Sequence, residues 1–216
     1  MMRNRVVALV GATALVTPLL PLALAPAYAA DVAVADTTVL ARTTKAAAKD
    51  KAADVWSHTP ESGYQFYGAL PAVDVRRATA EHTARKVVLT MSFTDLSKGG
   101  AYQSFLFQVR TKKMIRHALV YVFPGKPKGV VYLRTQKDAD VSAKGIEHRV
   151  DYGEDKVRIA IPRRLLKKPA WVRVAMYNAA STDGSDYYQD NPHHSGAMGQ
   201  QEWLEDPPLS MRIYPG

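Results

Sequence analysis

The amino-acid sequence predicts an all-β fold, an antiparallel β-sandwich of the jelly-roll kind. Apolar residues recur at every second position in several runs, turn-forming residues separate these runs, and one short segment alone has a helical pattern. Alternation with a period of two is typical of strands that bury one face, whereas helical apolar positions recur every three to four residues. The turn spacing favours a sandwich or barrel over alternating helices and strands.

The alternation locates the strands along the chain. In the first clear run, Val87, Leu89 and Met91 alternate with residues that we expect to face the other way. Arg163–Lys168, enclosed by two prolines, predicts a short helical turn between two strands. The expected strands lie at residues 87–93, 105–109, 120–122, 131–133, 157–161, 172–176 and, as a closing strand, 209–213.

The N-terminal residues predict export. Two arginines, Arg3 and Arg5, precede a long apolar run, and Ala27–Ala29 has the small residues of a cleavage site. We therefore expect residues 1–29 to be a signal peptide and the protein to be secreted; no twin-arginine pair is present, which favours the general route. Residues 30–54 lack aromatic residues and predict a flexible leader that folding does not need. The folded domain is expected over residues 55–216.

The chain is basic and contains no cysteine. It has 29 Lys and Arg against 20 Asp and Glu, which favours acidic partners such as an anionic wall polymer. Basic runs at residues 110–116, 126–128 and 163–168 form either an anion-binding patch or solvated loop surfaces. They lack interleaved aromatic residues, so no sequence-specific nucleic acid partner is expected. The absence of cysteine excludes disulfides and thiolate chemistry, and without a second apolar span no stable membrane insertion is expected.

Two segments carry a family resemblance. Asp74–Leu96, which contains the motif HTARKVVLTMSFTDL, resembles a hairpin of uncharacterised secreted proteins from high-GC Gram-positive bacteria, and Ile161–Val174 is similar to their second signature, a Pro-Arg turn before a WVRV strand. The resemblance implies a β-sandwich of the carbohydrate-binding or DOMON-like kind and no particular activity. Several such proteins have a cysteine in the Pro-Arg turn, where this chain has Leu165 and Leu166, so the implied disulfide is absent. In the hairpin, we expect His82 to form a cross-strand hydrogen bond.

The loop at residues 182–194 contains the candidate metal ligands. Asp183, Asp186 and Asp190 offer carboxylate oxygens of the kind that Ca²⁺ binds, and no other cofactor is expected. Two alternatives stay open: the aspartates are ordinary turn formers, or His193 and His194 join Asp190 around a transition metal. We also expect aromatic residues near this loop to form either a sugar-stacking platform or part of the core. These ligand-binding candidates are Tyr187, Tyr188 and Trp203.

No local catalytic motif is found in the sequence. We therefore expect a non-enzymatic binding module for an extracellular ligand, either a glycan or an anionic cell-wall polymer. One alternative is a secreted hydrolase whose carboxylates come from separated loops. Another is a protein-binding or structural module, and the sequence does not indicate an oligomeric state. The carboxylates considered for hydrolysis are Glu147, Asp151, Glu154, Asp155, Glu202, Glu205 and Asp206.

Overall fold

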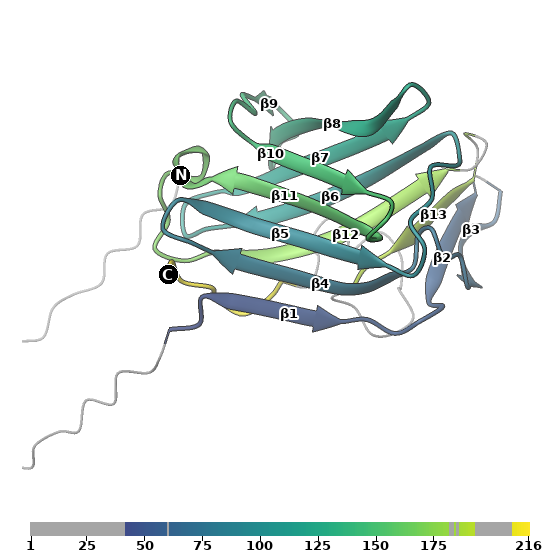
Figure 1. Cartoon of the computed structure of the whole chain (residues 1–216), viewed down its shortest axis with the longest axis horizontal. Helices are drawn as coiled ribbons and strands as arrows, with labels where there is room; N and C mark the ends of the chain where they lie inside the picture. The colour runs from purple at the N-terminus through teal and green to yellow at the C-terminus, as the bar shows by residue number, and fades with distance from the viewer. Residues whose placement is uncertain (1–41, 60, 182–183, 185, 193–208) are drawn as a thin grey trace, which may run out of the picture. The chain divides into compact units, whose positions relative to one another are not determined.

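The computed structural model describes residues 42–59, 61–181, 184, 186–192 and 209–216. Over these residues the chain forms two antiparallel β-sheets that stack face to face, which confirms the predicted all-β sandwich (Figure 1). The expected helical turn is a 3₁₀ helix, η1, at Arg163–Leu166. Within the described part of the chain, no helix has the length and apolar character needed to cross a membrane.

The five-stranded sheet faces the viewer in Figure 1, and its strands run in the order β1-β4-β5-β11-β10. Its centre is the predicted hairpin, in which β4 pairs with β5 through residues that include Ala80 opposite Leu89. The strands of this sheet are β1 (Lys45–Lys49), β4 (Val75–His82), β5 (Lys86–Phe93), β10 (Glu147–Asp151) and β11 (Lys156–Pro162).

The eight-stranded sheet lies behind it and has the order β3-β2-β13-β12-β6-β7-β8-β9. Three long neighbours, β12, β6 and β7, form its middle, and β2, β3 and β13 extend it on one side (Figure 1). The strands of this sheet are β2 (Val55–Thr59), β3 (Gly63–Gly68), β6 (Tyr102–Arg110), β7 (Ile115–Phe123), β8 (Lys126–Thr135), β9 (Asp140–Val141), β12 (Arg173–Ser181) and β13 (Tyr187–Asp190).

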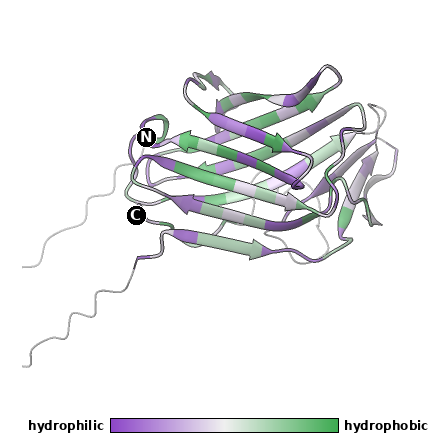
Figure 2. Cartoon of the chain, viewed as in Figure 1, coloured by the Kyte–Doolittle hydropathy of each residue, from purple (hydrophilic) through white to green (hydrophobic). Residues whose placement is uncertain are grey.

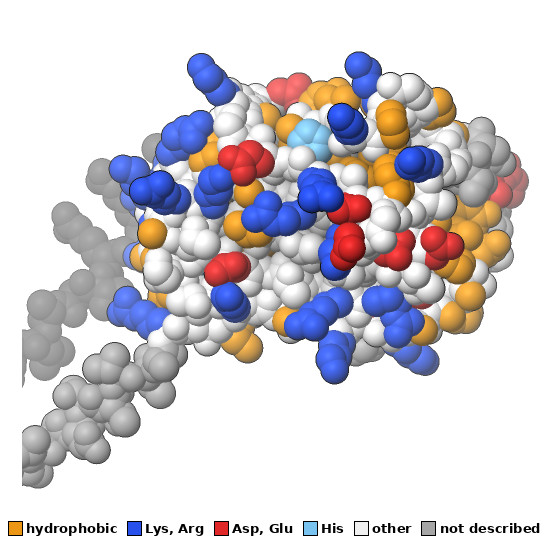
Figure 3. Space-filling view, in the orientation of Figure 1, with side chains coloured by type: hydrophobic (Ala, Val, Ile, Leu, Met, Phe, Trp, Pro, Cys, Tyr) orange, Lys and Arg blue, Asp and Glu red, His pale blue; other side chains and the backbone are white. Residues whose placement is uncertain are grey.

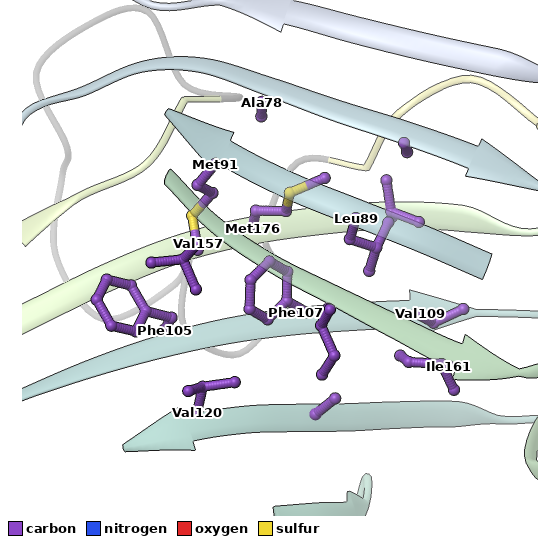
Figure 4. Close-up of a cluster of buried hydrophobic side chains, with 14 of the residues drawn as sticks. Ala78, Leu89, Met91, Phe105, Phe107, Val109, Val120, Val157, Ile161 and Met176 are labelled. Atoms are coloured by element: carbon purple, nitrogen blue, oxygen red, sulfur yellow. The ribbon is translucent and has the colours of Figure 1, made fainter. Parts of the chain in front are cut away.

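One apolar core fills the space between the sheets. Hydrophilic and hydrophobic residues alternate along the strands in Figure 2, and the hydrophobic positions point inward, as the period of two predicts. Phe93 of one sheet meets Phe105 of the other edge to face, with ring centroids 5.6 Å apart. Figure 4 shows the centre of this layer, where Leu89 and Ile161 lie opposite Phe107 and Val109. Each such side chain contributes about 1.5–3 kcal/mol when fully buried.

Residues 42–54 correct the predicted leader. Lys45–Lys49 is strand β1, paired over its whole length with β4 (Glu81 to Arg77), so a flexible leader reaching residue 54 is wrong for this part. Small alanines make this possible: Ala46 and Ala48 point inward and pack on the core, while the outer positions are exposed. The segment has little apolar surface of its own to stabilise a folded conformation. The open edge of β4 compensates for this, because it supplies hydrogen-bond partners for the backbone of β1.

The expected closing strand at residues 209–213 is reduced to a single bridge. Ile213 pairs with Val172 by two backbone hydrogen bonds of 2.8 and 2.9 Å. Further along, the Ser210 hydroxyl accepts the Val174 N–H at 3.0 Å, where a strand would place a backbone carbonyl. This side-chain acceptor interrupts the ladder and limits the strand to the Ile213 bridge.

Candidate functional site

Four tyrosines share the outer face of the eight-stranded sheet. Tyr102, Tyr121 and Tyr132 belong to β6, β7 and β8, and Tyr187 begins β13. The strand register places Tyr102 and Tyr187 on either side of Ser181 in β12. The residues next to each tyrosine along its strand point into the core or toward it, so the four rings face away from the five-stranded sheet. We call these four residues the tyrosine row.

Rings of the tyrosine row contact one another edge to face. The ring centroids of Tyr102 and Tyr187 are 5.9 Å apart, and those of Tyr121 and Tyr132 are 5.7 Å apart. This geometry is the favourable one for aromatic pairs. Because neighbouring strands lie about 4.8 Å apart, the four steps from β8 to β13 give the row a length of roughly 19 Å. The row is therefore long enough for an extended ligand.

The phenol of Tyr102 stays neutral at physiological pH. Burial raises the pKa of Tyr102 to about 12, and the nearby Tyr187 and Tyr121 act in the same direction. Tyr132, at the β8 end, is 39% exposed. The row thus offers flat apolar rings together with hydroxyl groups that donate and accept hydrogen bonds.

A second aromatic pair extends this surface beyond Tyr187. Trp56 of β2 and Phe66 of β3 are register partners, and their ring centroids lie 5.8 Å apart. Trp56 pairs with Gln189, two residues from Tyr187, and so lies on the same face of the sheet. Phe66 is 62% exposed, a larger exposed fraction than that of Tyr132 at the other end of the row. Together with the tyrosine row, this pair gives the outer face of the sheet a series of neighbouring aromatic side chains.

The structure separates the three aromatic residues predicted from the sequence. Tyr187 belongs to the tyrosine row. Tyr188 points to the opposite face, where it packs with Val55 and Val73, and its ring centroid lies 4.7 Å from that of Tyr67. Neighbouring residues of a strand face opposite ways, so these two tyrosines cannot form one platform. Trp203 lies outside the described residues.

A cluster of three carboxylates lies at the end of the sandwich where β1 leads into β2. Asp50 follows β1, Asp54 precedes β2 and Asp190 ends β13, and each offers an oxygen within 4.8 Å of the others. The backbone positions this acidic cluster: the Val75 N–H donates to Asp190 at 2.5 Å, and the Asp50 N–H donates to the Arg76 carbonyl at 3.2 Å.

The carboxylates of the acidic cluster resist ionisation. Burial raises the pKa of Asp50 to about 8, and the charges of Asp190 and Asp54 raise it further. Burial likewise raises the pKa of Asp190 to about 7, against the Val75 hydrogen bond, which lowers it. The pKa of Asp54 is also raised, again mainly by burial. Three such groups either hold protons or share a cation, and carboxylate oxygens suit a hard divalent ion such as Ca²⁺.

Only one of the three predicted metal ligands is found in the acidic cluster. Asp190 is a member, Asp186 is not, and Asp183 lies outside the described residues. Asn178 faces Asp190 across the β12–β13 register and is fully buried. Its amide NH₂ donates to the Val73 carbonyl at 2.7 Å, while its Oδ1 accepts no hydrogen bond within the part of the chain that is described. A buried amide oxygen without a hydrogen-bond donor among the described residues therefore belongs to the register partner of Asp190.

A lysine-lined hollow lies at the other end of the sandwich. Tyr102 begins β6 and Arg110 ends it, so the turn after β6 is roughly 26 Å from Tyr102 along the strand. Tyr132 is level with Leu106 of β6 through the strand register, and this level is roughly 13 Å from Arg110. This turn and the loop after η1 enclose about 250 Å³. Figure 3 shows Lys and Arg side chains crowded at the end that carries η1. The residues that define the lysine hollow are Thr111, Lys112, Lys113, Lys167, Lys168 and Trp171.

The carboxylates considered for hydrolysis have other partners in the structure. Glu147 accepts the Lys86 ammonium at 2.6 Å, and Asp155 accepts the Leu96 N–H at 2.8 Å. Glu147 begins β10 and Asp155 lies in the turn before β11, so they occupy opposite ends of one hairpin. Asp151 and Glu154 pair with basic neighbours. Glu202, Glu205 and Asp206 lie outside the described residues.

No protein-family profile matches the chain, and neither the curated proteins nor the solved structures give a match. The candidate sites therefore rest on the geometry alone. Sequence reasoning missed Tyr102, Tyr121 and Tyr132 as site residues, although the alternation that places Val120 inside places Tyr121 outside. It also missed Asp50 and Asp54, because both fall in the segment interpreted as a leader.

Proposed function

We propose that the protein is a secreted, non-enzymatic binding module whose tyrosine row binds a glycan. The observation that carries this proposal is the alignment of four tyrosines across five neighbouring strands on one outer face. A sugar ring has an apolar face of C–H groups and a rim of hydroxyls. A tyrosine matches both, because its ring is apolar and its hydroxyl exchanges hydrogen bonds.

The row suits binding better than catalysis. Its rings are held by strands and by one another, so little side-chain freedom is lost when a ligand binds. The Tyr102 phenol, whose pKa is raised, is a poor acid and a poor base near neutral pH. Glu147, one of the carboxylates considered for hydrolysis, is paired with Lys86, which likewise favours a binding function over hydrolysis.

The test is a pull-down of the protein with insoluble polysaccharide and cell-wall fractions, followed by titration with fragments of the fraction that binds. Tyr132→Ala removes the most exposed ring of the row and is expected to weaken binding at least tenfold, about 1.4 kcal/mol. Tyr132→Phe keeps the ring and is expected to retain most of the affinity.

The matched control is Tyr67→Ala. Tyr67 is an exposed tyrosine that packs on Tyr188 and does not belong to the row. We expect this variant to bind as the unaltered protein does. Equal losses for the Tyr67 and Tyr132 variants, or no retention by any polysaccharide fraction, would overturn the proposal.

A further inference from the structure

The lysine hollow gathers positive charge without a neighbouring carboxylate. Lys112 and Lys113 enter it from the β6–β7 turn, and Lys167 and Lys168 from the loop after η1. Within the described residues, no acidic side chain lines the hollow and none of the four lysines forms an ion pair. Like charges that converge in this way repel one another unless an anion lies between them.

The backbone of two of these lysines is strained. Lys167 and Lys168 have φ angles of +57° and +46°, in the left-handed region that L-residues with a side chain disfavour. The position after a helix end commonly takes glycine, which adopts this conformation freely. Lysine at two successive positions of this kind means that the side chains are kept at some expense of stability, as is often seen at functional sites.

Both loops of the hollow are held by specific hydrogen bonds. The Thr111 hydroxyl accepts the backbone N–H groups of Lys113 and Met114 at 3.1 and 3.0 Å, which shapes the β6–β7 turn. On the other side, the Arg163 guanidinium donates to the Pro169 carbonyl at 2.7 Å, and the Lys168 N–H donates to the Arg163 carbonyl at 2.8 Å. These hydrogen bonds therefore fix the backbone conformation of the two loops that carry the lysines.

One further cation contacts a residue that lines the hollow. The Arg212 guanidinium lies 4.7 Å from the centre of the Trp171 ring. Trp171 lines the hollow, and Arg212 itself does not. By contrast, a larger hollow of about 480 Å³ over β1, β4 and β5 is lined by side chains of both positive and negative charge, and its Lys45 pairs with Glu81 at 3.4 Å.

We propose that the lysine hollow binds an extended phosphate polymer, at a site separate from the tyrosine row. Lysine ammonium groups are compact point charges without the planar fork of arginine, so they select charge density and not one flat anion. Successive phosphates along a chain supply that density. Binding of a single-stranded nucleic acid commonly uses aromatic rings on which bases stack, and Trp171, the aromatic residue of the hollow, is already in contact with Arg212.

The first test measures binding of fluorescently labelled inorganic polyphosphate to the protein between 50 and 200 mM salt. The double variant Lys112→Gln, Lys113→Gln removes two charges and is expected to bind at least tenfold more weakly. The slope of log K against log salt should fall in magnitude by about 1.4, since each phosphate contact contributes about 0.7 on a flexible strand.

The matched control is the double variant Lys126→Gln, Lys128→Gln. It removes the same charge from exposed lysines at the β7–β8 turn, which lies at the far end of β7 from the hollow. We expect it to keep nearly the full affinity and salt slope. Equal losses in the two double variants would overturn the proposal, because binding would then follow net charge. Equal affinity for a single-stranded oligonucleotide of matched charge would overturn the choice of polymer.

A second measurement separates binding from structure. Lys168→Gly relieves the left-handed backbone and is expected to raise the melting temperature while it weakens polyphosphate binding several-fold. If Lys168 only maintained the fold, its substitution would lower both the melting temperature and the affinity for polyphosphate. If Lys168→Gly leaves the affinity unchanged, Lys168 takes no part in the site and the proposal fails at that residue; failure here leaves the glycan proposal untouched, because Tyr132 lies elsewhere.

Discussion

The imidazole of His82 binds the carbonyl oxygen of Ile213, with 3.0 Å between Nδ1 and the oxygen. A carbonyl only accepts, so Nδ1 carries the proton. The bond joins the end of β4 to the C-terminal segment, 131 residues later in the chain. His82 is fully buried. Its imidazole bonds to Ile213 and not across its own hairpin, so the expected cross-strand hydrogen bond is wrong.

His82→Leu is expected to destabilise the protein by about 0.5–1.5 kcal/mol, because the buried Ile213 carbonyl loses its side-chain donor and keeps only the Val172 N–H. For a domain of this size each kcal/mol lowers the melting temperature by about 2–4 °C. The measurement is thermal unfolding at pH 7.5. His148→Leu is the control: it removes a 3.2 Å bond to the Gly129 carbonyl at a half-buried site and is expected to cost less. Equal losses would show that burial of the His82 bond adds nothing.

The same histidine predicts acid sensitivity. Burial lowers the pKa of His82 below its ordinary value of 6.5, so the unfolded chain binds the proton more readily than the folded one. Stability is therefore complete above pH 6.5 and is lost as the pH falls through the lower, folded pKa. Melting temperatures between pH 4.5 and 7 in the His82→Leu variant should decline less than in the unaltered protein. An unchanged pH profile would contradict this.

The acidic cluster predicts the opposite trend at higher pH. With folded pKa values of about 8 for Asp50 and about 7 for Asp190, the folded state holds protons that the unfolded state releases near pH 4. Stability is therefore greatest below pH 4 for this cluster and declines as the pH rises to 8. Asp50→Asn should flatten the decline and stabilise the protein at pH 8 by roughly 2 kcal/mol, a figure reduced for solvent screening of this half-buried group. Asp186→Asn should leave the profile as it is.

Calcium should reverse that decline. The ionised acidic cluster offers three carboxylates, and Asn178, the register partner of Asp190, has a buried amide oxygen that accepts no hydrogen bond from the described residues. At pH 8, calcium at a hundredfold excess over its Kd would add about 2.7 kcal/mol, while at pH 5 protons compete and the gain shrinks. The measurement is the melting temperature with calcium, magnesium or chelator at equal ionic strength. Asp54→Asn should abolish the gain and Asp186→Ala should keep it; identical melting in calcium and chelator would remove the site.

The core positions of the strands could be predicted from the sequence, whereas the neighbours across strands could not. The period of two placed Leu89, Phe107 and Val120 in the core correctly, because alternation depends only on local geometry. It could not place Tyr102 beside Tyr187, which are 85 residues apart in the sequence, because strand order is a property of the whole fold. For the same reason the lysines of residues 112–113 and 167–168 were visible as basic runs but not as one hollow.

The composition of residues 45–49 does not predict their structure, for a different reason. Residues 45–49 have a composition that does not form a strand alone, and their structure comes from the open edge of β4. Asp50 and Asp54 enter the acidic cluster only because β1 leads the chain back to that end of the sandwich. Composition records the apolar surface of a segment, whereas ordering here depends on backbone partners that lie elsewhere in the chain.

Removal of β1 is therefore expected to destabilise the domain. A chain that begins at Asp50 loses five residues of pairing with β4 and uncovers the buried Ala78 and Ala80, which are the register partners of Ala48 and Ala46 in β1. It also loses the hydrogen bond from the Tyr214 N–H to the Thr43 carbonyl, 2.8 Å long, which holds the C-terminal segment. We expect the melting temperature to fall by more than about 5 °C relative to a chain that begins at Arg42, since the loss exceeds about two kcal/mol. Equal melting temperatures of the two chains would mean that β1 adds no stability and that residues 42–49 behave as the sequence alone suggests.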